Sequence, residues 1–247
     1  MESVLDRVIK QNTENVNLLK TKDYNIFSVL QIQSKEVLIC RMIADLLNPR
    51  GQHGAGAEYL KIFLRDCLGM EKMDTKLADQ AIVTAEYAID DERRIDIVIE
   101  IGSYFLPIEV KIYAADQKSQ CFDYYQYAKR RDAQAKVYYL TLDGHRPGKD
   151  STSSGNRSVT EEDIVCLSFR EHILNWLKAC KNCGNTGMIP ILEQFIHNIE
   201  QISGYTSEKV RNMVIDELLK SGDSLRAGMQ IADSINAAKA KRFCSKL

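Results

Sequence analysis

The stretch Arg94–Lys111, RIDIVIEIGSYFLPIEVK, decides the fold. Apolar and polar residues alternate along it with a period of two, and isoleucine and valine, which favour strands, fill most of its apolar positions. Gly102 and Ser103 divide the stretch and suit a two-residue turn. The pattern predicts an antiparallel hairpin, in which a strand over 94–101 is followed by a return strand over 104–113.

The turn also fixes which residues of the hairpin face one another. With two residues in the turn, Asp96 lies directly across from Glu109, and Lys111 follows two positions later on the same face. In the first strand, alternation predicts one face for Ile95, Ile97, Ile99 and Ile101 and the other for Asp96, Val98 and Glu100. In the return strand, it predicts one face for Ile108, Val110 and Ile112 and the other for Glu109, Lys111 and Tyr113. Two carboxylates and one amine are therefore expected together on one surface.

Helical and extended patterns on both sides of the hairpin predict an α/β protein. Helices are expected over 30–47, 59–68, 115–130, 170–181, 190–203, 207–220 and 223–243, strands over 81–89, 136–142 and 164–169, and a loop rich in Gly, Ser and Asn over 143–160. This order predicts a mixed central sheet flanked by helices, in a core over residues 1–169. Residues 170–247 are expected to form a helical C-terminal extension packed on that core.

The overall charge limits how the chain can meet nucleic acid. Its 247 residues carry 33 Lys and Arg against 34 Asp and Glu, a net charge of -1, and 45% of them are hydrophobic. A protein that coats nucleic acid without specificity is usually basic overall. Contact with a phosphate backbone would therefore need a local basic patch, for which Lys129-Arg130-Arg131 is the best candidate in the core.

Cysteine usage and hydropathy indicate the compartment. Seven cysteines occur without a repeated spacing, which favours reduced thiols, and Cys180-x-x-Cys183 lacks the second pair that a zinc site needs. Residues 1–20 lack the apolar core of a signal peptide, and no apolar run approaches the roughly 18 residues of a membrane span. We expect a cytoplasmic protein that does not enter a membrane.

The carboxylate pair has a physical use. Carboxylates about 5 Å apart on neighbouring strands repel each other, and each resists ionisation unless a cation compensates. Mg²⁺ suits this task because it prefers oxygen ligands and keeps several waters. Lys111 could then hold an attacking water or neutralise charge on a phosphate. The alternative is a solvated sheet face with scattered charge, which is the common meaning of a bare E-x-K, and the matching register of Asp96 argues against it.

These residues resemble the PD-(D/E)XK nuclease superfamily, whose signature is D…(D/E)-x-K on adjacent strands. Three further stretches resemble a bacterial branch of that superfamily with a RecB-like helix: Ser34–Pro49 with Gln52-His53-Gly54, Arg93–Ile97, and the Gln120-x-x-x-Tyr124 helix motif. Ile95 stands where the superfamily name has proline, a position at which proline is widely absent. The resemblance spans about residues 26–142, and no family motif is recognised beyond about 170.

The resemblance implies a role for each matching residue. Asp96 and Glu109 match the metal ligands, with the Val110 carbonyl as a third, and Lys111 matches the catalytic lysine. The helix glutamate corresponds to Glu36, which reaches the metal directly or through water, and the helix glutamine that orients the site or the substrate corresponds to Gln120. Contacts with substrate are expected from Arg94, His53 and Tyr124. The default role of a loop histidine such as His53 is to satisfy the backbone or face the surface, and Arg94 could instead pair with Asp91 or Glu92.

The resemblance implies a metal-dependent hydrolase of phosphodiester bonds, with Mg²⁺ as the cofactor and Mn²⁺ as a substitute. DNA is the expected substrate and RNA the less favoured one. Two alternatives stay open: a nucleic-acid-binding protein that keeps the fold without turnover, and a protein whose C-terminal helices dock a partner subunit or a second copy of the chain. Fold alone does not choose between them.

Overall fold

The computed structural model describes residues 24–71, 74–183, 185–205 and 208–244. The chain divides into two compact units, one over Asn25–Tyr205 and a second composed of both chain ends, Met1–Tyr24 and Thr206–Leu247. Residues 1–23 of the second unit lie outside the described residues. The prediction that residues 1–20 lack a signal peptide therefore also falls outside them. The candidate site lies within Asn25–Tyr205.

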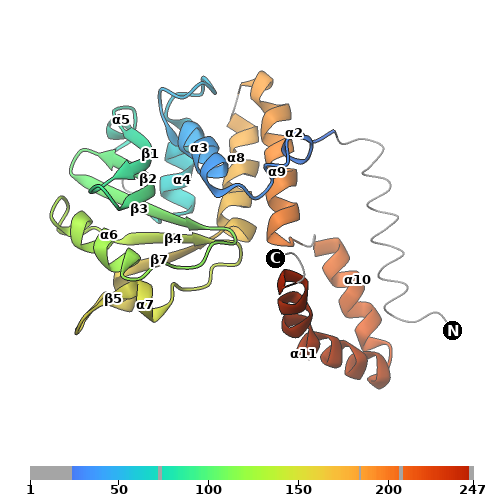
Figure 1. Cartoon of the computed structure of the whole chain (residues 1–247). Helices are drawn as coiled ribbons and strands as arrows, with labels where there is room; N and C mark the ends of the chain where they lie inside the picture. The colour runs from blue at the N-terminus through green and yellow to red at the C-terminus, as the bar shows by residue number, and fades with distance from the viewer. Residues whose placement is uncertain (1–23, 72–73, 184, 206–207, 245–247) are drawn as a thin grey trace. The chain divides into compact units, whose positions relative to one another are not determined.

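The larger unit follows the predicted order of elements (Figure 1). Its helices are α2 (Ile26–Val29), α3 (Glu36–Leu47), α4 (Glu58–Asp66), α5 (Thr75–Ala78), α6 (Gln120–Lys129), α7 (Lys149–Thr152), α8 (Leu174–Cys183) and α9 (Ile189–Ser203). Its strands are β1 (Ile82–Ala88), β2 (Arg94–Ile101), β3 (Tyr104–Lys111), β4 (Val137–Thr141), β5 (Ser153–Ser154), β6 (Arg157–Ser158) and β7 (Ile164–Ser168).

The central sheet has five strands in the order β1-β2-β3-β4-β7. The first three pair antiparallel and the last two parallel, so the predicted mixed sheet flanked by helices is confirmed. The hairpin register is confirmed as well, because Ile101 pairs with Tyr104 and Ile97 with Ile108 across the turn. Gly102 has a φ of 57°, a left-handed conformation that glycine adopts without steric cost.

Helices cover both faces of the sheet (Figure 1). On one face, α3, α4, α8 and α9 pack with the inward isoleucines of β2 and β3 into the largest buried cluster. On the other face, α6 packs against a smaller cluster that includes Val98 and Phe105. Glu109 and Lys111 alternate with the residues of the first cluster along β3, so their side chains lie on the α6 face.

The compact unit extends past the predicted core boundary at residue 169. Helices α8 and α9 belong to Asn25–Tyr205 because their apolar stripes lie in the main core, where Trp176 and Phe195 are fully buried. The Trp176 indole also donates to the Tyr59 carbonyl of α4 over 2.8 Å. A core of this size needs the second helical layer, since α3 and α4 would otherwise expose apolar surface.

Two stretches differ locally from the predicted pattern. The helix expected over 115–130 begins at Gln120, and the preceding residues form a loop held by Ser119 N–H on the Asp150 carbonyl over 2.7 Å. The expected loop over 143–160 contains the short helix α7 and the small hairpin β5–β6. In the second unit, α10 (Glu208–Leu219) and α11 (Gly222–Cys244) contact one another. No helix in the described residues has the length and apolar character to cross a membrane.

Candidate active site

Asp96 lies where β2 and β3 separate. Their paired residues end at Ile97 and Ile108. The predicted pairing of Asp96 with Glu109 is therefore absent from the ladder. Instead the Asp96 carboxylate turns toward β3, where its Oδ2 accepts a hydrogen bond from the Val110 N–H over 2.8 Å. The predicted face of Ile95 is also wrong: Ile95 joins Val98 in the α6-side cluster, whereas Ile97 joins the α3-side core.

Glu109 and Lys111 form a buried ion pair on β3. Lys111 Nζ lies 2.5 Å from Glu109 Oε1, and the two side chains are 7% and 1% exposed. The second carboxylate oxygen, Glu109 Oε2, is buried and has no hydrogen-bond partner among the described residues. An unpartnered buried carboxylate oxygen is costly unless a cation or water satisfies it.

Asp96, Glu109 and Lys111 influence one another's pKa values. Burial raises the pKa of Glu109 well above its usual value, and the nearby Asp96 charge raises it further. Burial also raises the pKa of Asp96, against the lowering effect of the Val110 N–H and of Lys111. Burial opposes the charge on Lys111, but Glu109, Asp96 and Glu36 outweigh it and raise the pKa of the amine. Two acids that resist ionising thus share one cationic side chain.

Glu36 reaches the site from the first turn of α3. Its Oε2 accepts a hydrogen bond from the Ile112 N–H, just after β3, over 2.8 Å. Beside it, Cys40 is 1% exposed, and burial followed by the charges of Asp96, Glu36 and Glu109 raises the pKa of its thiol. The structure therefore brings Glu36 together with the hairpin residues, which strand alternation alone could not show.

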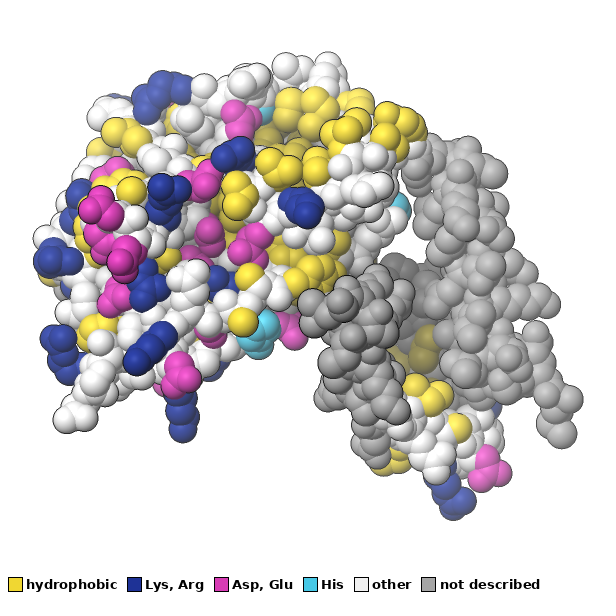
Figure 2. Space-filling model, viewed as in Figure 1, with side chains coloured by type: hydrophobic (Ala, Val, Ile, Leu, Met, Phe, Trp, Pro, Cys, Tyr) yellow, Lys and Arg dark blue, Asp and Glu magenta, His cyan; other side chains and the backbone are white. Residues whose placement is uncertain are grey.

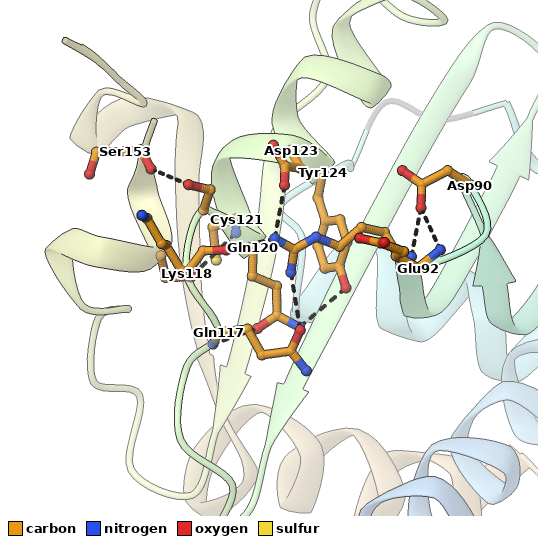
Figure 3. Close-up of polar contacts among 12 residues, drawn as sticks. Asp90, Glu92, Gln117, Lys118, Gln120, Cys121, Asp123, Tyr124 and Ser153 are labelled. Atoms are coloured by element: carbon orange, nitrogen blue, oxygen red, sulfur yellow. Dashed lines mark hydrogen bonds and ion pairs between the residues drawn. The ribbon is translucent and has the colours of Figure 1, made fainter. Parts of the chain in front are cut away.

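Gln120 and Tyr124 line the site from α6. Gln120 Nε2 donates to Tyr124 Oη over 3.2 Å (Figure 3). Tyr124 Oη in turn donates to the Arg94 carbonyl at the start of β2. Both residues are buried. After burial, the Glu109 charge is the second cause that raises the pKa of Tyr124, so the ring lies close to the carboxylates. The helix motif therefore connects α6 to the strand that carries Asp96.

Sequence reasoning missed Arg93. Its guanidinium donates to Gln117 Oε1 over 3.0 Å and to the Lys118 carbonyl over 2.6 Å, and it lies 3.1 Å from Asp123 Oδ2. Figure 3 shows Gln117 and Lys118 in the loop before α6 and Asp123 in the first turn of that helix. Arg93 thus ties the loop before α6 to the start of β2. The sequence contains two consecutive arginines, Arg93 and Arg94, but the predicted hairpin register singled out Arg94 as the candidate.

Arg94 and His53, two of the expected substrate contacts, lie at an exposed position of β2 and at a buried position of a loop, respectively. Arg94 pairs with Ala88 of β1, and because the β2–β3 pairing ends at Ile97 it has no ladder partner on β3. His53 is 1% exposed, its Nε2 is 3.0 Å from the Asn48 carbonyl, and its Nδ1 accepts from the Ala55 N–H over 3.1 Å. This geometry favours the loop-backbone role for His53.

The predicted basic run Lys129-Arg130-Arg131 at the end of α6 contacts aromatic rings. The Arg131 guanidinium lies 4.8 Å from the Tyr127 ring centroid and 5.3 Å from that of Phe105, and the Lys129 amine lies 5.2 Å from that of Tyr125. Figure 2 shows Lys and Arg interspersed with Asp and Glu on the face in view, in keeping with the near-zero net charge.

The donor set fits a hard divalent cation. No group of three or more His, Cys, Asp and Glu side chains is arranged as a metal site within the described ranges. Mg²⁺ usually takes one or two carboxylates and completes its shell with water and substrate phosphate. Asp96 and Glu109 supply such a pair, and Glu109 Oε2 accepts no hydrogen bond from the described residues.

The fold and the site define a class: a mixed sheet whose central hairpin carries two carboxylates and a lysine. A family model described as the PD-(D/E)XK nuclease superfamily matches residues 24–197, most of the chain. The chain belongs to the PD-(D/E)XK nuclease superfamily. The match extends past the predicted limit near 142 and takes in α8 and most of α9, in agreement with the compact unit. No curated protein and no solved structure gives a significant match.

Proposed function

We propose that this protein is a metal-dependent nuclease that hydrolyses phosphodiester bonds of DNA, with Asp96, Glu109 and Lys111 at its centre. The observation that carries the proposal is Glu109 Oε2, a buried and unpartnered carboxylate oxygen beside a second buried carboxylate and a lysine. A purely structural hairpin would not keep such a group, because removing it would relieve both desolvation and repulsion. A site that binds a cation has use for it.

Each residue has a task that follows from its contacts. Asp96 and Glu109 bind the cation, and the Val110 N–H orients Asp96 by its hydrogen bond. When bound, Mg²⁺ supplies Lewis-acid chemistry to the phosphate group. Lys111 donates a hydrogen bond to the attacking water or to the phosphate as its charge grows. We assign Glu36 to reaching the cation directly or through water, and Gln120 to orienting the site or the substrate.

The remaining assignments are also proposals. The Val110 carbonyl is a third ligand, and Tyr124 orients the site through Gln120. Mn²⁺ is expected to replace Mg²⁺, since both accept oxygen ligands. The cytoplasmic location and the docking of a partner or second copy through the C-terminal helices stay predictions.

The test is a cleavage assay on purified protein. Linear duplex, circular duplex and single-stranded DNA and a matched RNA are incubated with Mg²⁺, Mn²⁺ or EDTA. We expect cleavage of DNA with either metal and none in EDTA, and loss of cleavage in Asp96→Asn and Glu109→Gln. Glu100→Gln is the matched control, because Glu100 lies on the same hairpin but faces Arg131, 3.6 Å away.

Three outcomes separate the alternatives. DNA binding in EDTA without cleavage in any metal would favour the binding protein that keeps the fold without turnover. Faster cleavage of RNA than of DNA would correct the substrate. Equal cleavage by Glu100→Gln and Asp96→Asn would refute the assignment of the hairpin carboxylates.

A further inference from the structure

The pairing of β1 with β2 is interrupted beside Asp96. Paired residues run from Ile82↔Glu100 to Ala85↔Ile97 and continue at Tyr87↔Ile95, passing over Glu86 and Asp96 without a shift in register. Glu86 has a φ of 53°, a left-handed conformation that residues other than glycine, asparagine and aspartate adopt rarely within a strand. A strained backbone within a regular ladder often marks a functional position.

Both strands change face at this point. In a regular strand, residues two apart share a face. Ala85 and Ile97 pack with the α3-side core, whereas their neighbours Tyr87 and Ile95 pack with the α6-side cluster. The alternation is therefore broken at Glu86 and at Asp96 together. The result is that the Asp96 side chain is directed along the sheet toward Val110 of β3 rather than onto either face.

Glu86 is held in place from α3. The guanidinium of Arg41 donates to Glu86 Oε2 through Nε over 3.2 Å and through Nη2 over 2.7 Å. The same helix holds β3 through Glu36 and the Ile112 N–H. Helix α3 is thus tied to the strand on each side of β2, so that Asp96 lies between its two anchor points. Cys40 lies between these anchors on α3, and burial, followed by the charges of Asp96, Glu36, Glu109 and Glu86, raises the pKa of its thiol.

We propose that Glu86 is a positioning residue: its left-handed backbone turns Asp96 into the gap between β2 and β3 where the cation binds. The inference rests on the proposed function, because it assigns Asp96 as a ligand. Glu86 itself acts through Asp96. The conformation matters more than the charge, since the break in alternation is a property of the backbone.

Two substitutions at one position separate conformation from charge. Glu86→Asn removes the charge and the Arg41 pair but tolerates positive φ, whereas Glu86→Val removes the same groups and opposes positive φ. We expect Glu86→Val to weaken Mn²⁺ affinity, measured by calorimetry, by roughly 10- to 100-fold, the usual cost of losing an outer-shell contact. Glu86→Asn should lose less than about 3-fold on the same scale. Ala88→Val, at an exposed and regularly paired position of β1, should bind like wild type.

The affinities are compared only among variants whose circular dichroism matches wild type. If Glu86→Val does not fold, Glu86→Ala takes its place, with an expected loss between those of Asn and Val. Equal affinities for the Asn and Val variants would overturn the inference, and so would a Val variant that binds Mn²⁺ like wild type. In both cases wild-type binding and cleavage would leave the proposed function standing. A wild type that binds no Mn²⁺ would overturn the proposed function and this inference with it.

Discussion

Removal of the Lys111 amine tests the ion pair at the centre of the site. Lys111→Ala leaves the Glu109 carboxylate, 1% exposed, without the cation that lies 2.5 Å from it. Breaking a buried pair by removing one partner costs roughly 3–5 kcal/mol of unfolding free energy when the other group stays charged. Glu109 can avoid part of this cost by taking up a proton, because burial and Asp96 have already raised its pKa.

The cost of Lys111→Ala should therefore depend on pH. The folded-state pKa of Glu109 is raised above its unfolded value near 4.3, so the folded state binds the extra proton and its stability falls as pH rises through that window. Removing Lys111 takes away a charge that lowers this pKa, which widens the window toward higher pH. The deficit of the variant relative to wild type should thus be smallest at pH 5 and should grow by at most about 1.4 kcal/mol per pH unit.

The assay is urea unfolding followed by circular dichroism at pH 5 and pH 8, in EDTA. Lys136→Ala, at an exposed lysine before β4, is the matched control and should lose less than about 0.5 kcal/mol at either pH. In Mg²⁺, folded Lys111→Ala should cleave about 10²- to 10³-fold more slowly than wild type. A deficit independent of pH would refute the role given to Glu109 protonation, and unchanged cleavage would refute the catalytic role of Lys111.

Three further predictions concern the surroundings of the pair. Mg²⁺ or Mn²⁺ should raise the melting temperature of wild type but not of Asp96→Asn, because a ligand that binds only the folded state stabilises it; equal shifts in differential scanning calorimetry would place the metal elsewhere. Tyr124→Phe removes the hydroxyl that joins Gln120 to the Arg94 carbonyl, and it should lower the free energy of unfolding in urea by about 1–3 kcal/mol. Cleavage should also slow as α6 loosens. An unchanged free energy of unfolding together with an unchanged cleavage rate would show that the link is dispensable. His53→Ala should lower the free energy of unfolding by about 2–4 kcal/mol, since two backbone contacts and the stack on Tyr59 are lost. Cleavage by the folded variant should stay near the wild-type rate. Slow cleavage at unchanged stability would favour a substrate contact for His53.

Local patterns determined the fold class and the hairpin. The period-two alternation and the Gly102-Ser103 turn predicted strands β2 and β3 and their register, because pairing across a two-residue turn involves neighbours in the sequence. The spacing of Glu109 and Lys111 followed for the same reason, since residues two apart on a strand share a face. The order of strands and helices then predicted a mixed sheet flanked by helices.

Tertiary contacts determined how those residues meet. Ile95 leaves the predicted face next to the point where Glu86 of β1 takes a left-handed conformation, and Arg41 of α3 contacts the Glu86 carboxylate. Glu36 reaches the site through the Ile112 N–H, 76 residues away. Such contacts join segments far apart in the sequence, and no periodicity within one segment records them. The sequence by itself determined which groups are available on the hairpin, and the packing of α3 and α6 on the sheet decided their final geometry.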